Sequence, residues 1–322
     1  MSLKGSEREF IFSLYMRQRQ QIIEDVLGFT LTDLLLEKYW DKLKIDLFGY
    51  EKNLGVPVMI EVWLGISNGY HQDRFIELID MLDEGTILVY LALGFQDKHI
   101  VELEKRVRGC DKPIKLILVN ISDRVLKPLE LLNTKHKLKI YGELAILDEI
   151  EKPLQLMKVI EHSLFKALSP KPLPDYHEFD FSRRVDINRY LLLRLREAVP
   201  NFLPVQREKR FYESNATIRL SGGKSGVDYF VSARNRRNQA FVELRFDDSN
   251  RELFQLFTSK PWLLREQIDE RIKIGNNAIG CYFRASENVK VTADELVKVF
   301  SRMVRAISYP LFDILKFEYQ MV

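Results

Sequence analysis

Hydrophobic and polar positions change their spacing several times along the chain, and each change marks an expected element. Residues 11–27 and 30–43 carry apolar side chains at helical spacing, which predicts two helices at the start of the chain. Residues 43–50 and 56–64 instead read as strands, with a turn signal at 53–55 between them. The chain is therefore expected to open with two helices and a β-hairpin.

After the hairpin, helical and strand-like patterns alternate. The segment 114–119 is nearly all aliphatic, as in a strand that is buried on both faces of a sheet. A hairpin followed by such an alternation predicts an α/β domain with a mixed central sheet over residues 1–168. Its later elements are expected to be helices at 68–82, 97–107 and 153–168, and strands at 86–93, 114–119 and 138–141.

Three alternate prolines between Ser169 and Asp175 favour an extended, stiff segment, so we expect a linker over residues 169–182. The chain behind it, residues 183–322, is expected to form an α+β domain with an antiparallel meander and a long terminal helix. The expected strands are 216–220, 227–233, 240–246 and 279–284; the expected helices are 186–199, 250–268 with a break at Pro261, and 293 to 317 with an interruption at Pro310.

Composition and charge narrow the function classes. The 322 residues include 49 Lys or Arg and 46 Asp or Glu, a net charge of +3, which argues against a surface that is basic all over. Two cysteines exclude a disulfide framework and a Cys-rich zinc site. Because no apolar run is long enough to span a membrane and no apolar signal region opens the chain, we expect a cytoplasmic protein without membrane contact.

The hairpin carries the most informative polar residues. Side chains alternate along a strand, so Lys44 and Asp46 share one face of the first strand, and Glu61 lies on the polar face of the second. Two neighbouring carboxylates can bind Mg²⁺, which prefers oxygen ligands and can activate water for phosphodiester hydrolysis. The alternative is an ordinary pair of solvent-facing acidic residues.

The stretches Ile45–Tyr50 and Val58–Gly65 resemble the central hairpin of the PD-(D/E)XK (restriction-endonuclease-like) nuclease superfamily. In that pattern an Asp ends one strand and Glu-x-Lys occupies the next, and Leu-Gly and a His follow in one subgroup, as Leu64-Gly65 and His71 do here. The resemblance covers roughly residues 8 to 166. It implies a nuclease-like fold in which Asp46 and Glu61 hold Mg²⁺ and act in catalysis.

The sequence departs from this pattern at position 63. Trp63 stands where the family has Lys, the residue understood to orient the attacking water and offset phosphoryl charge. An indole offers one N–H donor and no charge. The resemblance leaves Lys44, beside Asp46, as the third catalytic candidate, and Arg74 on the following helix as another.

The second domain resembles a family of prokaryotic domains of unknown function that are often fused behind a PD-(D/E)XK-like domain. The resemblance rests on Gly226–Val231, Arg234–Phe246, Asn250–Phe254 and the long terminal helix. It covers most of residues 183 to 320 and implies no known activity.

Basic residues concentrate in part of this second domain. Residues 183–251 contain 15 Lys or Arg against 8 Asp or Glu. The candidate nucleic-acid-binding residues are Arg234, Arg236 and Arg237 in the densest turn, Lys224 in the preceding turn, and Arg74 in the first domain. Such residues would bind phosphates of DNA or RNA with little sequence specificity. The alternative is a solvated hairpin tip that serves solubility.

The leading interpretation is a nucleic-acid-associated protein with a degenerate Mg²⁺-dependent endonuclease-like domain, either weakly active or inactive. A second interpretation makes the nuclease-type fold a non-enzymatic protein-interaction scaffold in which Trp63 packs over the former active site. A third makes the arginine turn a protein-binding surface for self-association, as in a homodimer.

Overall fold

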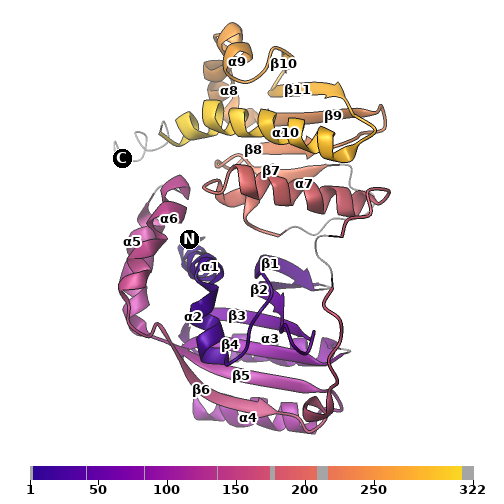
Figure 1. The fold of residues 1–322 in the computed structure, drawn as a ribbon. Helices are drawn as coiled ribbons and strands as arrows, with labels where there is room; N and C mark the ends of the chain where they lie inside the picture. Colours follow the sequence, from indigo (N-terminus) through magenta and orange to yellow (C-terminus); the bar gives the residue numbers. More distant parts are fainter. Residues whose placement is uncertain are drawn as a thin grey trace. The chain divides into compact units, whose positions relative to one another are not determined.

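The computed structural model describes residues 3–40, 42–82, 84–135, 137–174, 178–208 and 217–313. The chain folds into two compact units, one of Met1–Asp175 with Arg207–Lys209 and one of Tyr176–Gln206 with Arg210–Val322 (Figure 1). The first change of unit falls inside the segment expected to be the linker. The hydrophobic pattern does not predict that residues 207–209 belong to the first unit.

The first unit is built on a six-stranded mixed sheet whose strands lie in chain order from β1 to β6. Strands β3, β4 and β5 are parallel to one another, and every other neighbouring pair is antiparallel. The strands are β1 (Leu35–Trp40), β2 (Leu43–Tyr50), β3 (Pro57–Ile66), β4 (Thr86–Gly94), β5 (Ile114–Ile121) and β6 (Leu154–Glu161). The expected mixed α/β architecture is therefore confirmed.

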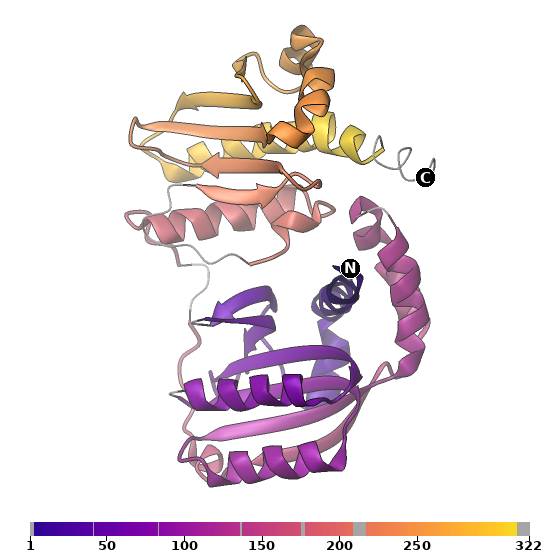
Figure 2. The same cartoon turned by 180° about the vertical axis from the view of Figure 1, so that it is seen from behind.

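Helices cover both faces of this sheet. The crossover helices α3 (Gly69–Met81) and α4 (Asp97–Gly109) lie on one face, in front of the sheet in Figure 2. Helices α1 (Leu3–Gln18) and α2 (Gln20–Leu27) lie on the other face, in front of the sheet in Figure 1. The helix expected at 11–27 is thus divided into α1 and α2, and a shorter helix pair, α5 (Leu126–Thr134) and α6 (Lys137–Glu143), follows β5.

The centre of the sheet is apolar on both faces, as the aliphatic run at 114–119 predicts. Along β5, Leu116, Ile117, Leu118 and Val119 are all at most 1% exposed. Each such side chain contributes about 1.5–3 kcal/mol of burial free energy, so β4 and β5 anchor the unit. The predicted start of α3 is confirmed as well, because the Asn68 side chain accepts a hydrogen bond from the His71 N–H at 3.1 Å.

Two sequence predictions in this unit were wrong because strand pairing overrides local propensity. Residues 30–43 have helical spacing but contain strand β1, whose Trp40 stacks on Phe48 of β2 with ring centroids 5.6 Å apart. Residues 153–168, expected as a helix, contain the edge strand β6, which pairs with β5 along its length. An edge strand needs only partial burial, so its apolar residues do not alternate regularly with polar ones and the sequence pattern does not identify it as a strand.

The third wrong prediction is the strand expected at 138–141, which lies inside helix α6. Only Ile140 of that helix is buried, so a single apolar contact gives no periodicity from which to recognise a helical turn.

The second unit contains a separate five-stranded antiparallel sheet in the order β10-β11-β9-β8-β7. Its consecutive strands β7, β8 and β9 form the expected meander. The strands are β7 (Ile218–Ser221), β8 (Val227–Ser232), β9 (Gln239–Phe246), β10 (Ile272–Ile274) and β11 (Ala278–Arg284). Helices α7 (Arg184–Ala198) and α10 (Val289–Met303) pack against each other beside this sheet (Figure 1).

Of the two prolines expected to interrupt helices of the second unit, Pro261 does so, whereas the helix continues through Pro310. Pro261 starts α9 (Pro261–Gln267) after α8 (Arg251–Thr258) has ended. Ahead of Pro310, the long terminal helix changes from α10 into a π-helical turn at Val304–Ser308, closed by Tyr309 N–H to the Val304 carbonyl. None of the helices in the described parts of the chain has the length and apolar character needed to cross a membrane.

Gly55, in the turn between β2 and β3, is expected to be irreplaceable. Its φ is +66°, and a Cβ there would lie 2.2 Å from the Lys171 carbonyl oxygen. Gly28 has a φ of +75° but open space around it, so it is a matched control for backbone strain alone. We predict that Gly28→Ala costs about 1 kcal/mol and that Gly55→Ala costs about 1–3 kcal/mol more. Equal losses in urea unfolding would contradict this packing.

Candidate functional site: a row of carboxylates across β1, β2 and β3

The register of the first sheet sets three acidic residues in one row across neighbouring strands. The β1–β2 pairs on either side of Glu37 place it opposite Asp46. Continued one step past Leu47↔Ile60, the β2–β3 register places Asp46 opposite Glu61. Three like charges at directly opposed positions repel one another unless cations or hydrogen bonds compensate them.

Asp46 occupies the middle of this row, where the pairing of β2 with β3 stops. Its Oδ2 accepts a hydrogen bond from the backbone N–H of Val62 at 3.0 Å, so the side chain takes the place of a backbone partner. Burial raises the pKa of Asp46, and the Val62 hydrogen bond and the charges of Arg74 and Lys44 oppose that rise. The negative charge of Glu37 adds to it.

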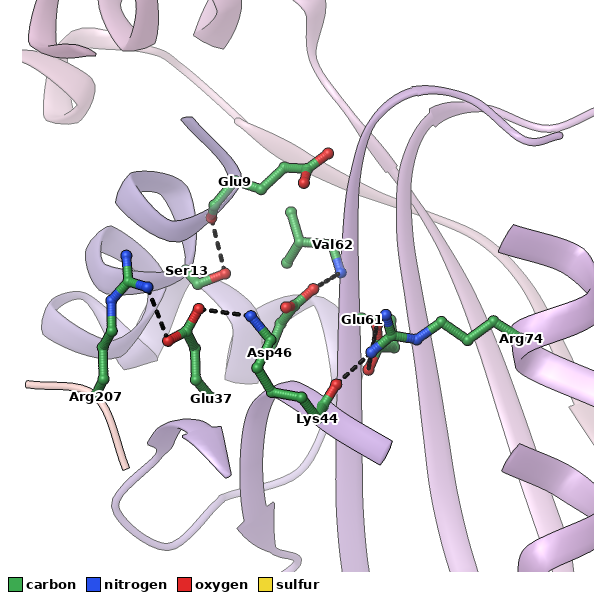
Figure 3. A network of polar contacts seen from close by, with 9 residues as sticks. All are labelled: Glu9, Ser13, Glu37, Lys44, Asp46, Glu61, Val62, Arg74 and Arg207. Atoms are coloured by element: carbon green, nitrogen blue, oxygen red, sulfur yellow. Dashed lines mark hydrogen bonds and ion pairs between the residues drawn. The ribbon is translucent and has the colours of Figure 1, made fainter. Parts of the chain in front are cut away.

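Glu61 is the most enclosed member of the row, with a side chain that is 8% exposed. The Arg74 guanidinium from α3 lies 3.0 Å from its Oε2 and 3.1 Å from its Oε1 (Figure 3). The same guanidinium donates to the Lys44 carbonyl oxygen. Burial holds the pKa of Glu61 well above its usual range, the charge of Asp46 raises it further, and Arg74 opposes both effects.

Glu37 binds two cations at the other end of the row. Lys44 Nζ lies 2.7 Å from one oxygen of Glu37, and Arg207 Nη1 lies 3.2 Å from the other. Arg207 belongs to the short segment that returns to the first unit, where the Glu208 N–H donates to the Leu36 carbonyl at 2.7 Å. The ammonium of Lys44, the catalytic candidate from the sequence, is thus directed to Glu37.

Glu9 is a fourth acidic residue near the row and was not expected from the sequence. Its Oε1 accepts a hydrogen bond from the Leu64 N–H at 3.4 Å, and Figure 3 shows its side chain reaching from α1 over Val62. Burial raises the pKa of Glu9 to about 7, the Leu64 hydrogen bond opposes this, and the charge of Asp46 adds to it. The only sequence signal is an acidic residue directly before the apolar run that starts at Phe10.

Trp63, at the position where the nuclease pattern has lysine, packs against the start of α3. Its ring lies 3.9 Å from that of His71, and its indole N–H donates to the Ile66 carbonyl at 3.0 Å. Gly65 is pressed against the indole, because a Cβ there would lie 2.7 Å from Nε1. The β3–β4 register shifts between Trp63 and Ile66, so the indole fixes an irregular strand end.

A buried Ser–His pair nearby has a structural role. Ser67 Oγ lies 2.9 Å from His99 Nδ1, and Ser67 is fully buried while His99 is 5% exposed. The Gln96 N–H donates to the same Ser67 oxygen at 2.9 Å. These bonds tie the end of β3 to the start of α4, and the serine has no exposed face from which to attack a substrate.

The candidate basic residues do not form a single patch. Lys224 precedes β8, and Arg234, Arg236 and Arg237 follow it, so they lie at opposite ends of a six-residue strand, about 20 Å apart. Arg236 and Arg237 are exposed, and Arg234 donates to the Ser286 carbonyl at 2.9 Å. Arg74 belongs to the other unit.

Asp46 and Glu61 have the chemistry that a Mg²⁺ site requires. Both offer carboxylate oxygens, and Asp46 bonds the backbone N–H of Val62, the residue next to Glu61. Arg74, however, already binds the Glu61 carboxylate. Among the described residues, no group of three His, Cys, Asp or Glu side chains is placed to hold a metal ion.

Comparison of the chain with protein-family models, with curated proteins and with solved structures returned no match.

The raised pKa of Glu9 gives a prediction for stability against pH. Because the folded-state pKa of about 7 exceeds the ordinary 4.5, the contribution of Glu9 to stability is fully present below pH 4.5 and is lost as pH rises through 7. A shift of this size corresponds to roughly 3 kcal/mol between the two limits. Glu9→Gln should remove this part of the slope in urea unfolding at several pH values. The exposed control Glu130→Gln should not, and identical slopes in both variants would contradict the burial of Glu9.

Proposed function

We propose that this chain is a nucleic-acid-associated protein whose first unit is a degenerate endonuclease-like module of the PD-(D/E)XK type. In this proposal Asp46 and Glu61 bind Mg²⁺ weakly, because Arg74 competes for the same carboxylate. The observation that carries it is the Arg74–Glu61 ion pair inside a row of opposed carboxylates.

The arrangement of elements supports this proposal. Two helices precede β1, β2 and β3, and one crossover helix then leads to β4, parallel to β3. The two acidic residues named by the family resemblance lie on β2 and β3, each next to the last printed pair, Leu47 with Ile60.

The geometry favours Arg74 over Lys44 as the cation that stands in for the missing lysine. Arg74 contacts Glu61 directly, whereas Lys44 contacts Glu37. A guanidinium binds phosphate oxygens in a bidentate manner and keeps its charge at all physiological pH values. It cannot take up or release a proton as a lysine can, so Arg74 would position a phosphodiester and offset its charge without moving a proton.

In this proposal Asp46, Glu61 and Arg74 would act together on a phosphodiester bound at the carboxylate row. When bound, Mg²⁺ activates water and stabilises charge on a phosphoryl group. Asp46 and Glu61 would hold the ion through their carboxylate oxygens, and Arg74, displaced from Glu61, would turn its charge to the phosphate. Because this exchange breaks a mostly buried ion pair, the module should bind metal poorly and cleave slowly.

The second candidate function is a non-enzymatic interaction scaffold. The observation in its favour is that the carboxylate row is compensated from within the chain: Lys44 and Arg207 bind Glu37, and Arg74 binds Glu61. Carboxylates that are paired with cations of the same chain do not require a metal ion to offset their charge. Trp63 packs against His71 in this account and simply fixes the end of β3.

Cleavage assays test the proposal. We expect slow nicking of plasmid and single-stranded substrates in Mg²⁺ or Mn²⁺, lost in both Asp46→Asn and Glu61→Gln. An Asp80→Asn variant on the exposed Arg106 pair of the same unit serves as the control and should keep wild-type activity. Cleavage that persists in Asp46→Asn or Glu61→Gln would remove the carboxylate row from the proposal.

Metal titration tests the competition directly. Arg74→Gln should bind Mn²⁺ about tenfold more tightly than the wild type, equivalent to about 1.4 kcal/mol, because the internal cation is gone. Glu61→Gln should lose the binding, and Arg106→Gln, on an exposed ion pair of α4, should behave as the wild type. Metal binding that is indifferent to both Arg74 and Glu61, in a protein without cleavage activity, would favour the scaffold.

A further inference from the structure

The five-stranded sheet of the second unit has one face covered by helices and one face without such cover. The covered face carries Tyr229, whose ring packs 4.9 Å from Phe300 of α10 and whose hydroxyl lies 2.7 Å from Ser308. In Figure 2 the yellow helix α10 lies behind the orange strands, so the other face of the sheet is turned to the viewer. Among the described residues, no helix packs on that open face.

The strand register identifies which side chains stand on the open face. Arg219, Phe230 and Glu243 are opposed across β7, β8 and β9. Two further rows run beside this one. The side chains on this face are Phe230, Phe241, Tyr282, Arg219, Arg245, Lys273, Arg284, Asp228 and Glu243. Phe241 and Glu243 are buried, and the other seven, which include the rings of Phe230 and Tyr282, are partly or fully exposed.

A stacked arginine lies at the centre of this face. The Arg245 guanidinium lies 4.1 Å from the centroid of the Phe230 ring, and Arg219 lies 5.9 Å from it on the neighbouring strand. Glu243 is bonded both to Arg245 and to the Tyr282 hydroxyl, which fixes the guanidinium in place. The Arg245 side chain is nevertheless 50% exposed, so its plane is held on the ring while it remains open to solvent.

The charge of the open face and its surroundings is positive. Four cations on the face stand against two carboxylates, Asp228 and Glu243, which pair with Arg219 and Arg245. The hairpin that joins β8 to β9 then adds the exposed Arg234, Arg236 and Arg237 at one end of the same strands. A polyanion laid along β8 and β9 would therefore meet stacked planes first and free cations next.

We propose that this open face, with the Arg234–Arg237 hairpin, binds single-stranded nucleic acid. Unpaired bases would stack on the Arg245 guanidinium and the Phe230 ring, and the phosphates would contact the hairpin arginines. Duplex DNA hides its base faces, so it could use the hairpin cations alone. The site lies wholly in the second unit and includes no residue of the carboxylate row.

Fluorescence anisotropy with the full chain tests this proposal. The probes are a labelled oligothymidylate of about 15 nucleotides and a labelled duplex of equal length, at several salt concentrations in EDTA. We expect tighter binding of the single strand, and about tenfold weaker binding of it by Phe230→Leu with an unchanged salt dependence. Arg245→Gln should weaken binding and also lower the salt slope by about one.

Controls separate this surface from charge in general and from the first unit. Arg265→Gln removes an exposed arginine of α9 and should change the single-strand affinity little. Asp80→Asn, in the other unit, should bind the oligonucleotide as the wild type does, and because the assay contains EDTA, failure here is distinct from failure of the metal site. Circular dichroism shows whether Phe230→Leu folds, and Arg245→Gln tests the same stack without removing the ring.

Three results would overturn the proposal. The first is wild-type protein that binds neither probe at low salt. The second is equal affinity for the duplex and the single strand, which would assign binding to phosphate contacts alone. The third is undiminished single-strand binding in both folded Phe230→Leu and Arg245→Gln.

Discussion

The arrangement of the first unit depends on the compensation of opposed carboxylates within one sheet. Glu37, Asp46 and Glu61 lie on the neighbouring strands β1, β2 and β3, and such a group of carboxylates is unstable without positive charge or hydrogen bonds. The chain supplies both from distant parts of its sequence. Arg74 comes from the crossover helix, and Arg207 comes from a segment that returns to this unit only for residues 207–209.

The same compensation limits what the module can do. A divalent ion at Asp46 and Glu61 must displace a guanidinium that already contacts both oxygens of Glu61. Burial and the charge of Asp46 raise the pKa of Glu61 well above its usual range, and Arg74 opposes both effects. We propose that this row is the remnant of a metal site in which Trp63 occupies the position of the family's lysine.

The sequence predicts the elements that depend on the local spacing of apolar and polar residues. The strands β2 to β5 and the capped start of α3 follow from alternation and turn signals. Strands β1 and β6 do not, because each is fixed by pairing with a neighbour at the edge of the sheet. Glu9 and Arg207 reach the row only through tertiary contacts, so no spacing rule identifies them.

The most direct measurement is a double-mutant cycle across Glu61 and Arg74, read by urea unfolding at neutral pH without metal. If Arg74 compensates a mostly buried carboxylate, each single variant, Glu61→Gln and Arg74→Gln, leaves an unpaired group, and the cycle should give a favourable coupling of about 2 kcal/mol or more. The coupling should shrink at acid pH, where Glu61 is protonated. A coupling near zero at neutral pH would contradict the claim that this ion pair stabilises the carboxylate row.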